Sequence, residues 1–100
     1  MGKRVLLVTT DLLFRSKLAG VVAAAGGEVT REAALCDLAV LELGGPGAER
    51  IADLLRRGVP VLAFGSHVLP DVLRAAREAG ATAVPNSQVA ERLAELLKTM

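Results

Sequence analysis

The sequence predicts one α/β domain built around a parallel sheet with helices on both faces. Short apolar runs rich in valine, alanine and leucine alternate with longer amphipathic segments along the chain, an order typical of strands and their crossover helices. The runs are apolar at consecutive positions, which indicates strands buried on both faces. A chain of 100 residues is long enough to form one domain with a sizeable core.

The first half of the chain supplies three predicted strands and one helix. Residues 4–8 (RVLLV) are a short apolar run, and Asp11 follows at the position of a helix N-cap. The helix ends at the glycine pair 26–27. The second and third strands are predicted at residues 28–32 and 37–43. The apolar stripe of the helix consists of Phe14, Leu18, Val21, Val22 and Ala25.

The second half of the chain alternates three predicted helices with two strands. Pro46 and Pro70 suit the starts of helices, whereas Gly58 and Gly80 suit their ends. Each strand lies between two of the helices. The helices are predicted at 48–57, 70–80 and 88–100, and the strands at 59–64 and 81–85.

One connection departs from this pattern. Only the short segment AALCD (33–37) separates the second strand from the third, although a parallel crossover normally needs about a dozen residues or more. Either the second helix is reduced to a turn, or the second strand pairs differently.

Composition excludes several classes of function. The net charge is +1 and acids and bases are interspersed, so there is no basic cluster to follow a phosphate backbone. There is also no tyrosine or tryptophan for base stacking, and we expect no nucleic-acid binding. The lone Cys36 excludes an internal disulfide and a multi-cysteine metal site, and we expect no cofactor.

Nothing in the chain predicts a membrane segment. No apolar run reaches the roughly 18 residues of a membrane span. Residues 1–11 begin with basic side chains, but their apolar run is too short for a signal peptide. We therefore expect a cytoplasmic protein without membrane contact. Arginine outnumbers lysine, which is typical of a GC-rich, thermophilic source.

Several segments, taken in order, resemble the receiver domain of response regulators. Residues 4–29 are similar to its opening strand and helix, and residues 36–47 to its phosphorylation strand. Residues 59–66 and 76–87 are similar to its fourth strand and to its turn into the fifth. The resemblance implies a three-layer flavodoxin-like fold with about five parallel strands, with the second helix reduced or absent.

The functional positions of that family are occupied by other residue types in this sequence. The resemblance places a pair of acids, a phosphoacceptor aspartate, a switch threonine or serine and a lysine at the ends of the strands. Glu42 keeps the spacing to Pro46 that the acceptor has to its proline, and Asp11 is retained beside the acid pair. The equivalent positions are Thr9 and Thr10 for the acids, Glu42 for the acceptor, Gly65 or Ser66 for the switch, and Ser87 for the lysine.

These substitutions predict a receiver-like domain that cannot be phosphorylated. Mg²⁺ favours charged oxygen ligands, and one carboxylate at 4 Å offers a divalent ion roughly 8 kcal/mol of gross attraction at an effective dielectric of 20. Threonine hydroxyls at 9 and 10 supply no such charge. Glutamate also carries its carboxylate one methylene further out, and in-line transfer can lose about 100-fold from a 1 Å misplacement.

Glu42 has two interpretations. As a functional group it would be a permanent stand-in for a phosphorylated aspartate, longer and always charged. As a structural group it would be a strand-end carboxylate that is solvated or bonded to backbone amides of the GGPG turn (44–47). We favour the structural interpretation, because Gly65 has no hydroxyl with which to respond to a phosphate mimic.

We expect the domain to act in signalling or regulation through protein–protein contacts, without enzymatic activity. The resemblance implies that residues 70–98 meet partners, and mixed charge on two neighbouring helices there suits a self-complementary homodimer. A merely solvated helix face is the alternative. The sequence does not identify the protein partner. The candidate interface residues are Arg74, Arg77, Glu78, Glu91, Arg92 and Glu95.

A rival hypothesis is a small anionic ligand or nucleotide bound at the carboxyl edge of the sheet. The polar loops after the strands meet along that edge, where ligands of open parallel sheets usually bind. A hydrolytic triad of His67 with Asp11 and Ser66 lacks any nucleophile motif. Besides residues 9–11, 65–66 and 87, the edge would use Gly44, Gly45, His67 and Asn86.

Overall fold

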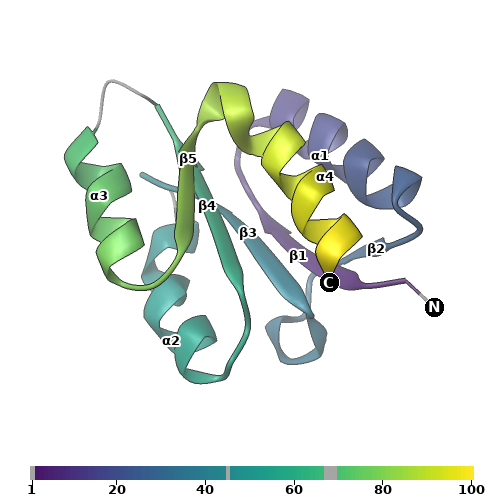
Figure 1. Ribbon diagram of the computed structural model, residues 1–100, viewed down its shortest axis with the longest axis horizontal. Helices are drawn as coiled ribbons and strands as arrows, with labels where there is room; N and C mark the ends of the chain where they lie inside the picture. Colours follow the sequence, from purple (N-terminus) through teal and green to yellow (C-terminus); the bar gives the residue numbers. More distant parts are fainter. Residues whose placement is uncertain (1, 45, 67–69) are drawn as a thin grey trace.

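The computed structural model describes residues 2–44, 46–66 and 70–100. Its centre is a five-stranded parallel sheet in the order β2-β1-β3-β4-β5, which is the flavodoxin-like arrangement. The predicted fold class is therefore confirmed (Figure 1). The strands are β1 (Arg4–Val8), β2 (Glu28–Thr30), β3 (Leu38–Glu42), β4 (Val61–Gly65) and β5 (Thr82–Pro85).

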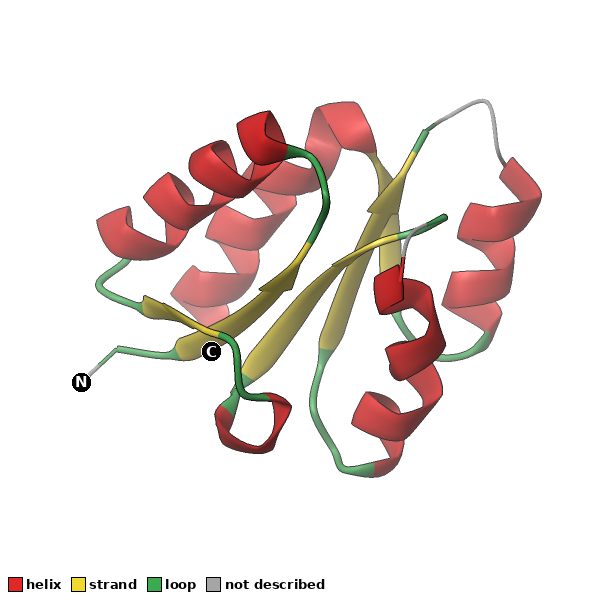
Figure 2. Ribbon diagram, turned by 180° about the vertical axis from the view of Figure 1, so that it is seen from behind, coloured by secondary structure: helices red, strands yellow, loops and turns green. Residues whose placement is uncertain are grey.

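Helices cover both faces of the sheet, as Figure 2 shows from behind. One pair of α-helices packs on one face and a second pair on the other. Short 3₁₀ turns fill three of the connections. The α-helices are α1 (Leu12–Ala24), α2 (Ile51–Arg56), α3 (Pro70–Glu78) and α4 (Val89–Thr99), and the 3₁₀ turns are η1 (Ala33–Leu35), η2 (Pro46–Arg50) and η3 (Asn86–Gln88).

The sheet separates two apolar cores. Successive side chains of a strand point to opposite faces, so Val5 and Leu7 of β1 pack with α1 and α4, whereas Leu6 packs in the core under α2 and α3. Phe64 of β4 is fully buried under α1 and α4 and lies 5.3 Å from the ring centre of Phe14. Burial of one such side chain stabilises the fold by about 1.5–3 kcal/mol.

The short connection after β2 replaces a helix. β2 pairs in parallel with β1, and the chain returns to β3 through η1 alone, so the second helix is reduced to a turn. Cys36 follows η1 and is buried, with its Sγ donating to the carbonyl oxygen of Ala33 at 3.2 Å. Burial raises the pKa of the Cys36 thiol.

Two sequence predictions are wrong in this part of the molecule. β2 was expected at 28–32 and buried on both faces, but it ends at Thr30, and Glu28 and Val29 are exposed. The physical reason is that β2 is an edge strand paired only with β1, with no α-helix between it and β3. Ala25, expected in the apolar stripe of α1, is its exposed C-cap.

The N-terminal end of the sheet depends on close backbone packing. The Glu28 N–H donates to the carbonyl oxygen of Lys3 at 2.9 Å. A methyl group on Gly2 would lie 1.7 Å from the carbonyl oxygen of Gly26, and one on Gly27 would lie 2.8 Å from that of Lys3. Only glycine allows the start of the chain to lie this close to the α1–β2 turn.

Candidate functional site

The carboxyl ends of β1 and β3 bring the central residues of the candidate site together. These strands are neighbours in the sheet, with Val8 opposite Leu41 in the register. Thr9 and Thr10 follow β1, and Glu42 is the last residue of β3. Strand order alone therefore places the equivalents of the acid pair beside the equivalent of the phosphoacceptor.

Glu42 is bound by the two threonines. Its Oε1 accepts hydrogen bonds from Thr9 Oγ1 at 2.7 Å and from the Thr10 N–H at 3.1 Å, with Thr10 Oγ1 at 3.5 Å. Of the two interpretations of Glu42, the geometry favours the structural one. The expected amide donors were in the GGPG turn, however, and these donors lie in the β1–α1 loop, because the longer glutamate side chain reaches across to the neighbouring strand.

Asp11 is the N-cap of α1, as predicted. Its Oδ1 accepts from the N–H groups of Leu13 at 2.9 Å and Phe14 at 3.1 Å, and its own N–H donates to Thr9 Oγ1 at 3.1 Å. A cap of this kind stabilises a helix by about 0.5–2 kcal/mol. One hydrogen-bond chain therefore runs from Glu42 through Thr9 to the start of α1.

This donor set does not fit the Mg²⁺ that receiver chemistry uses. Thr9 and Thr10 present hydroxyls where that chemistry uses carboxylates, and they donate to Glu42 rather than leave it free for a metal. In the described part of the chain, no three His, Cys, Asp or Glu side chains lie close enough to hold a metal ion. Of the two carboxylates near this point, Asp11 caps α1 and Glu42 is bound by the threonines, whereas Mg²⁺ favours clustered, free carboxylates.

Gly65, at the switch position, is a packing residue. It is buried at the end of β4, and a methyl group there would lie 3.3 Å from Cβ of Leu43. A threonine or serine at this point would push against Leu43. The position therefore has a structural reason to lack the hydroxyl of a switch residue.

Among the described residues of this edge, Gly44, Asn86 and Ser87 make no hydrogen bond to Glu42. Ser87 is exposed, and Asn86 Oδ1 is buried without a hydrogen-bond partner among the residues that the structure describes. Gly44 is exposed in a left-handed turn conformation with φ 84°. Gly45 and His67, also predicted at this edge, lie outside the described residues.

The predicted interface residues surround the β5 edge of the sheet. Arg74 pairs with Asp71 at 2.6 Å, and Arg77 Nε donates to the carbonyl oxygen of Ala83 at 3.0 Å. The expectation of two neighbouring helices is wrong, because α3 and α4 lie on opposite faces of the sheet, on either side of β5 (Figure 1). The remaining members of the set are exposed: Glu78, Glu91, Arg92 and Glu95.

Apolar surface that the sequence did not predict lies at the start of α1 and between α2 and α3. Leu12 and Leu13 at the start of α1 are 79% and 83% exposed. A shallow groove of about 480 Å³ runs between α2 and α3. Its walls are mainly small apolar side chains, including Ala52, Ala75 and Ala79. Such patches on a small protein indicate contact surfaces.

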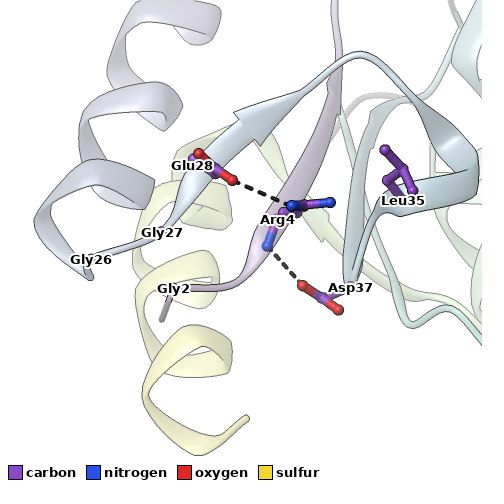
Figure 3. Close-up of a pocket in the computed structure, with 7 residues that line it drawn as sticks. All are labelled: Gly2, Arg4, Gly26, Gly27, Glu28, Leu35 and Asp37. Carbon is purple, nitrogen blue, oxygen red and sulfur yellow. Dashed lines mark hydrogen bonds and ion pairs between the residues drawn. The ribbon is translucent and has the colours of Figure 1, made fainter.

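A second hollow lies at the opposite end of the sheet (Figure 3). It measures about 440 Å³ and is lined by Arg4, Glu28 and Asp37 among others. Arg4 Nε pairs with Glu28 at 3.3 Å, and Asp37 Oδ2 accepts from the Arg4 N–H at 2.8 Å. These charged groups bind one another. The residues that line the hollow therefore link β1 to β2 and to the segment just before β3.

Comparison with known proteins places the fold. No family model matches the chain, and no curated protein matches it significantly. Solved structures do resemble it. The BeF3-activated receiver domain of DrrB has a TM-score of 0.80 at 18% identity, covering 99% of this chain and 97% of that one. A CheY-like receiver domain protein from Methanospirillum hungatei JF-1 has a TM-score of 0.77 at 21% identity, covering 99% and 93%.

NtrX from Brucella abortus is a longer protein with a similar part. Its TM-score is 0.77 at 19% identity, and the match covers 99% of this chain but 26% of NtrX. The chain therefore spans about a quarter of the NtrX chain that it resembles. At such identities the likeness establishes a receiver-type fold. No helix in residues 2–44, 46–66 and 70–100 is long and apolar enough to cross a membrane.

Proposed function

We propose that this chain is a receiver-fold signalling or regulatory module that is not switched by phosphorylation and acts by protein–protein contact. The observation that carries the proposal is the Glu42 carboxylate bound by Thr9 and Thr10. The same three positions would carry the acceptor and the metal-binding acids of a phosphorylated receiver.

Phosphoryl transfer to Glu42 is opposed by both charge and geometry. Its Oε1 accepts from two donors at 2.7 and 3.1 Å. These bonds turn the carboxylate toward the β1–α1 loop, and in-line transfer is sensitive to such a misplaced nucleophile. Ser87 offers no positive charge to stabilise the transferred group. The proposal therefore assigns no catalytic reaction to the chain.

The same hydrogen bonds favour a single fixed state. They link the end of β3 to the β1–α1 loop, and through Thr9 and Asp11 to the start of α1. Gly65 has no hydroxyl to move toward this point and packs against Leu43. A domain without a second arrangement transmits information by being bound or released, and not by changing shape.

The proposed contact region is the β5 edge with the helices on either side of it. An edge strand offers unpaired backbone groups to another chain, and α3 and α4 surround β5 with charges of both signs, including Glu78 and Arg92. The apolar groove between α2 and α3 adjoins this region through α3. These features support a protein partner, with a second copy of the chain as our first candidate.

Intact-protein mass spectrometry tests the proposal. The chain is incubated with a small phosphoryl donor such as acetyl phosphate, with and without Mg²⁺. We expect no added mass in either condition. A single adduct that needs Mg²⁺ and is removed by hydroxylamine would overturn the proposal, because it would identify a working carboxylate acceptor.

A matched variant and a mass measurement in solution complete this test. The variant carries Thr9→Asp, Thr10→Asp, Glu42→Asp and Ser87→Lys, which restores the chemistry of the family at all four positions. If the variant is phosphorylated and the original chain is not, the original chain's lack of phosphorylation is due to those four residues.

Light scattering over a range of protein concentrations should show a mass that rises toward a dimer, and a constant monomer mass would count against self-association.

A further inference from the structure

Three arginines from separate parts of the chain line one small pocket. It measures about 180 Å³, lies against the end of β1 and is lined by Arg15, Arg31 and Arg50 together with Thr9 and Thr10. No acidic side chain contributes to its lining.

The strand order explains why these arginines converge. β2 and β3 lie on either side of β1. Arg31 directly follows β2, and Arg50 ends η2, the turn that follows β3. Arg15 belongs to α1, which begins just after β1. Each arginine therefore comes from the segment that leaves one of three adjacent strands at the same edge of the sheet.

The reduced second helix leaves this pocket open. The chain leaves β2 and reaches β3 through η1, which lies near the start of β3, at the far end of the strands (Figure 2). Residues 31–37, all of which the structure describes, form no α-helix that could pack over the carboxyl end of β1.

The three guanidinium groups lack anionic partners within the described residues. Arg4, Arg56, Arg57 and Arg74 each pair with a carboxylate, but no ion pair involves an arginine of the pocket. The carboxylates at this edge have other partners: Asp11 caps α1, and Glu42 is bound by Thr9 and Thr10. Like charges that converge without a counter-charge repel one another, and a bound anion would relieve this repulsion.

We propose that the pocket binds a compact, phosphate-type dianion. Guanidinium groups present planar, bidentate donors that match the oxygens of a phosphate. Pockets for drug-sized ligands measure roughly 300–1,000 Å³, so a pocket of about 180 Å³ fits one phosphate group and not a whole nucleotide. The binding is non-covalent and does not depend on the proposed function. Its charged ligands are the three arginines, and Thr9 and Thr10, which also line the pocket, can stay bonded to Glu42.

Thermal unfolding and calorimetry of the full chain test this inference. Inorganic phosphate and glycerol 3-phosphate are titrated separately, at an ionic strength held constant with sodium chloride. We expect the melting temperature to rise with phosphate, because a ligand that binds only the folded state stabilises it in proportion to RT ln(1 + [L]/Kd). If only inorganic phosphate binds, the site takes the free anion. If glycerol 3-phosphate binds as well, the site also accepts a phosphomonoester.

Single substitutions locate the site. Arg31→Gln and Arg50→Gln remove exposed guanidinium groups, and we expect each to raise the Kd for phosphate by about tenfold or more, the size expected for a lost charged hydrogen bond. Arg56→Gln, at an exposed arginine at the end of α2, makes the same change of charge elsewhere and should leave the Kd unchanged. Circular dichroism checks that every variant is folded.

Three results would overturn the inference. One is a melting temperature that rises no more with phosphate than with chloride, and another is an equal loss of affinity in the Arg56→Gln variant. The third is unchanged affinity in Arg31→Gln and Arg50→Gln. A Glu42→Gln variant that still binds phosphate keeps this outcome separate from that of the phosphorylation test, because Glu42 is not one of the proposed ligands.

Discussion

The two faces of the sheet differ in the size of the side chains that fill them. The core under α1 and α4 consists of large side chains, with Phe64, Leu18 and Leu93 fully buried. The core under α2 and α3 contains many alanines, among them Ala39 and Ala63 at the centre of the sheet. The second face also has a groove between its helices and an open pocket beside β1.

This difference suggests a division of roles between the faces. Large, fully buried side chains contribute most to stability, because the free energy of burial scales with the apolar area removed from water. Small side chains and a missing helix leave concave surface, which a partner or a ligand can fill. We therefore expect stability to depend mainly on the α1/α4 face and binding on the α2/α3 face.

Truncation of Phe64 should give the largest loss of stability. Phe64→Ala removes a ring that is 0% exposed and lies against Phe14, and such changes cost about 3–5 kcal/mol. Leu18→Ala on this face and Leu41→Ala on the other form the matched pair, because they remove the same atoms from equally buried positions. We expect the smaller loss at Leu41, whose core contains smaller side chains. Urea unfolding of both variants measures the difference, and an equal or larger loss for Leu41→Ala would refute the division of roles.

Removal of the Glu42 carboxylate should have an intermediate effect. Glu42→Ala removes the acceptor of the Thr9 hydroxyl and the Thr10 N–H, and hydrogen bonds to a charged group contribute about 1.5–3 kcal/mol. Glu42→Gln keeps an acceptor oxygen and should lose less. Unfolding midpoints of both variants check this, and an unchanged midpoint for Glu42→Ala would show that the link between β3 and the β1–α1 loop is not stabilising.

The sequence pattern predicts which segments form helices and strands better than it predicts what packs against them. Strand and helix types follow from local periodicity, and the Asp11 cap follows from its place before an apolar helix. Burial of β2 on both faces was expected by analogy with the other strands, although Val29 is the one apolar residue of EVTRE (28–32). Its place at the edge of the sheet depends on strand order. Burial on both faces needs a neighbour on each side and a helix on each face, neither of which is encoded locally.

The contacts of the candidate site are likewise not encoded locally in the sequence. The resemblance singled out positions 9, 10 and 42, which lie in contact, but the donors to Glu42 depend on the register between β1 and β3. The arginine pocket was missed altogether, since Arg15, Arg31 and Arg50 are far apart in the chain and no local motif joins them. The strand order β2-β1-β3, combined with a search for unpaired cations, is the signal that would have found it.

Substitution of Cys36 should give the smallest change in stability, and this change should depend on pH. It belongs to the α2/α3 core, and burial raises the pKa of its thiol above that of the unfolded chain. The native state then holds the proton more tightly than the unfolded state, so the thiol's contribution to stability is complete below the unfolded pKa and is lost as the pH rises through the folded pKa. In Cys36→Ala this alkaline loss should disappear from the pH profile of the melting temperature. Matching alkaline slopes in the two proteins would show that the thiol is no more protected than in the unfolded chain, and that this less completely covered face admits water as far as Cys36.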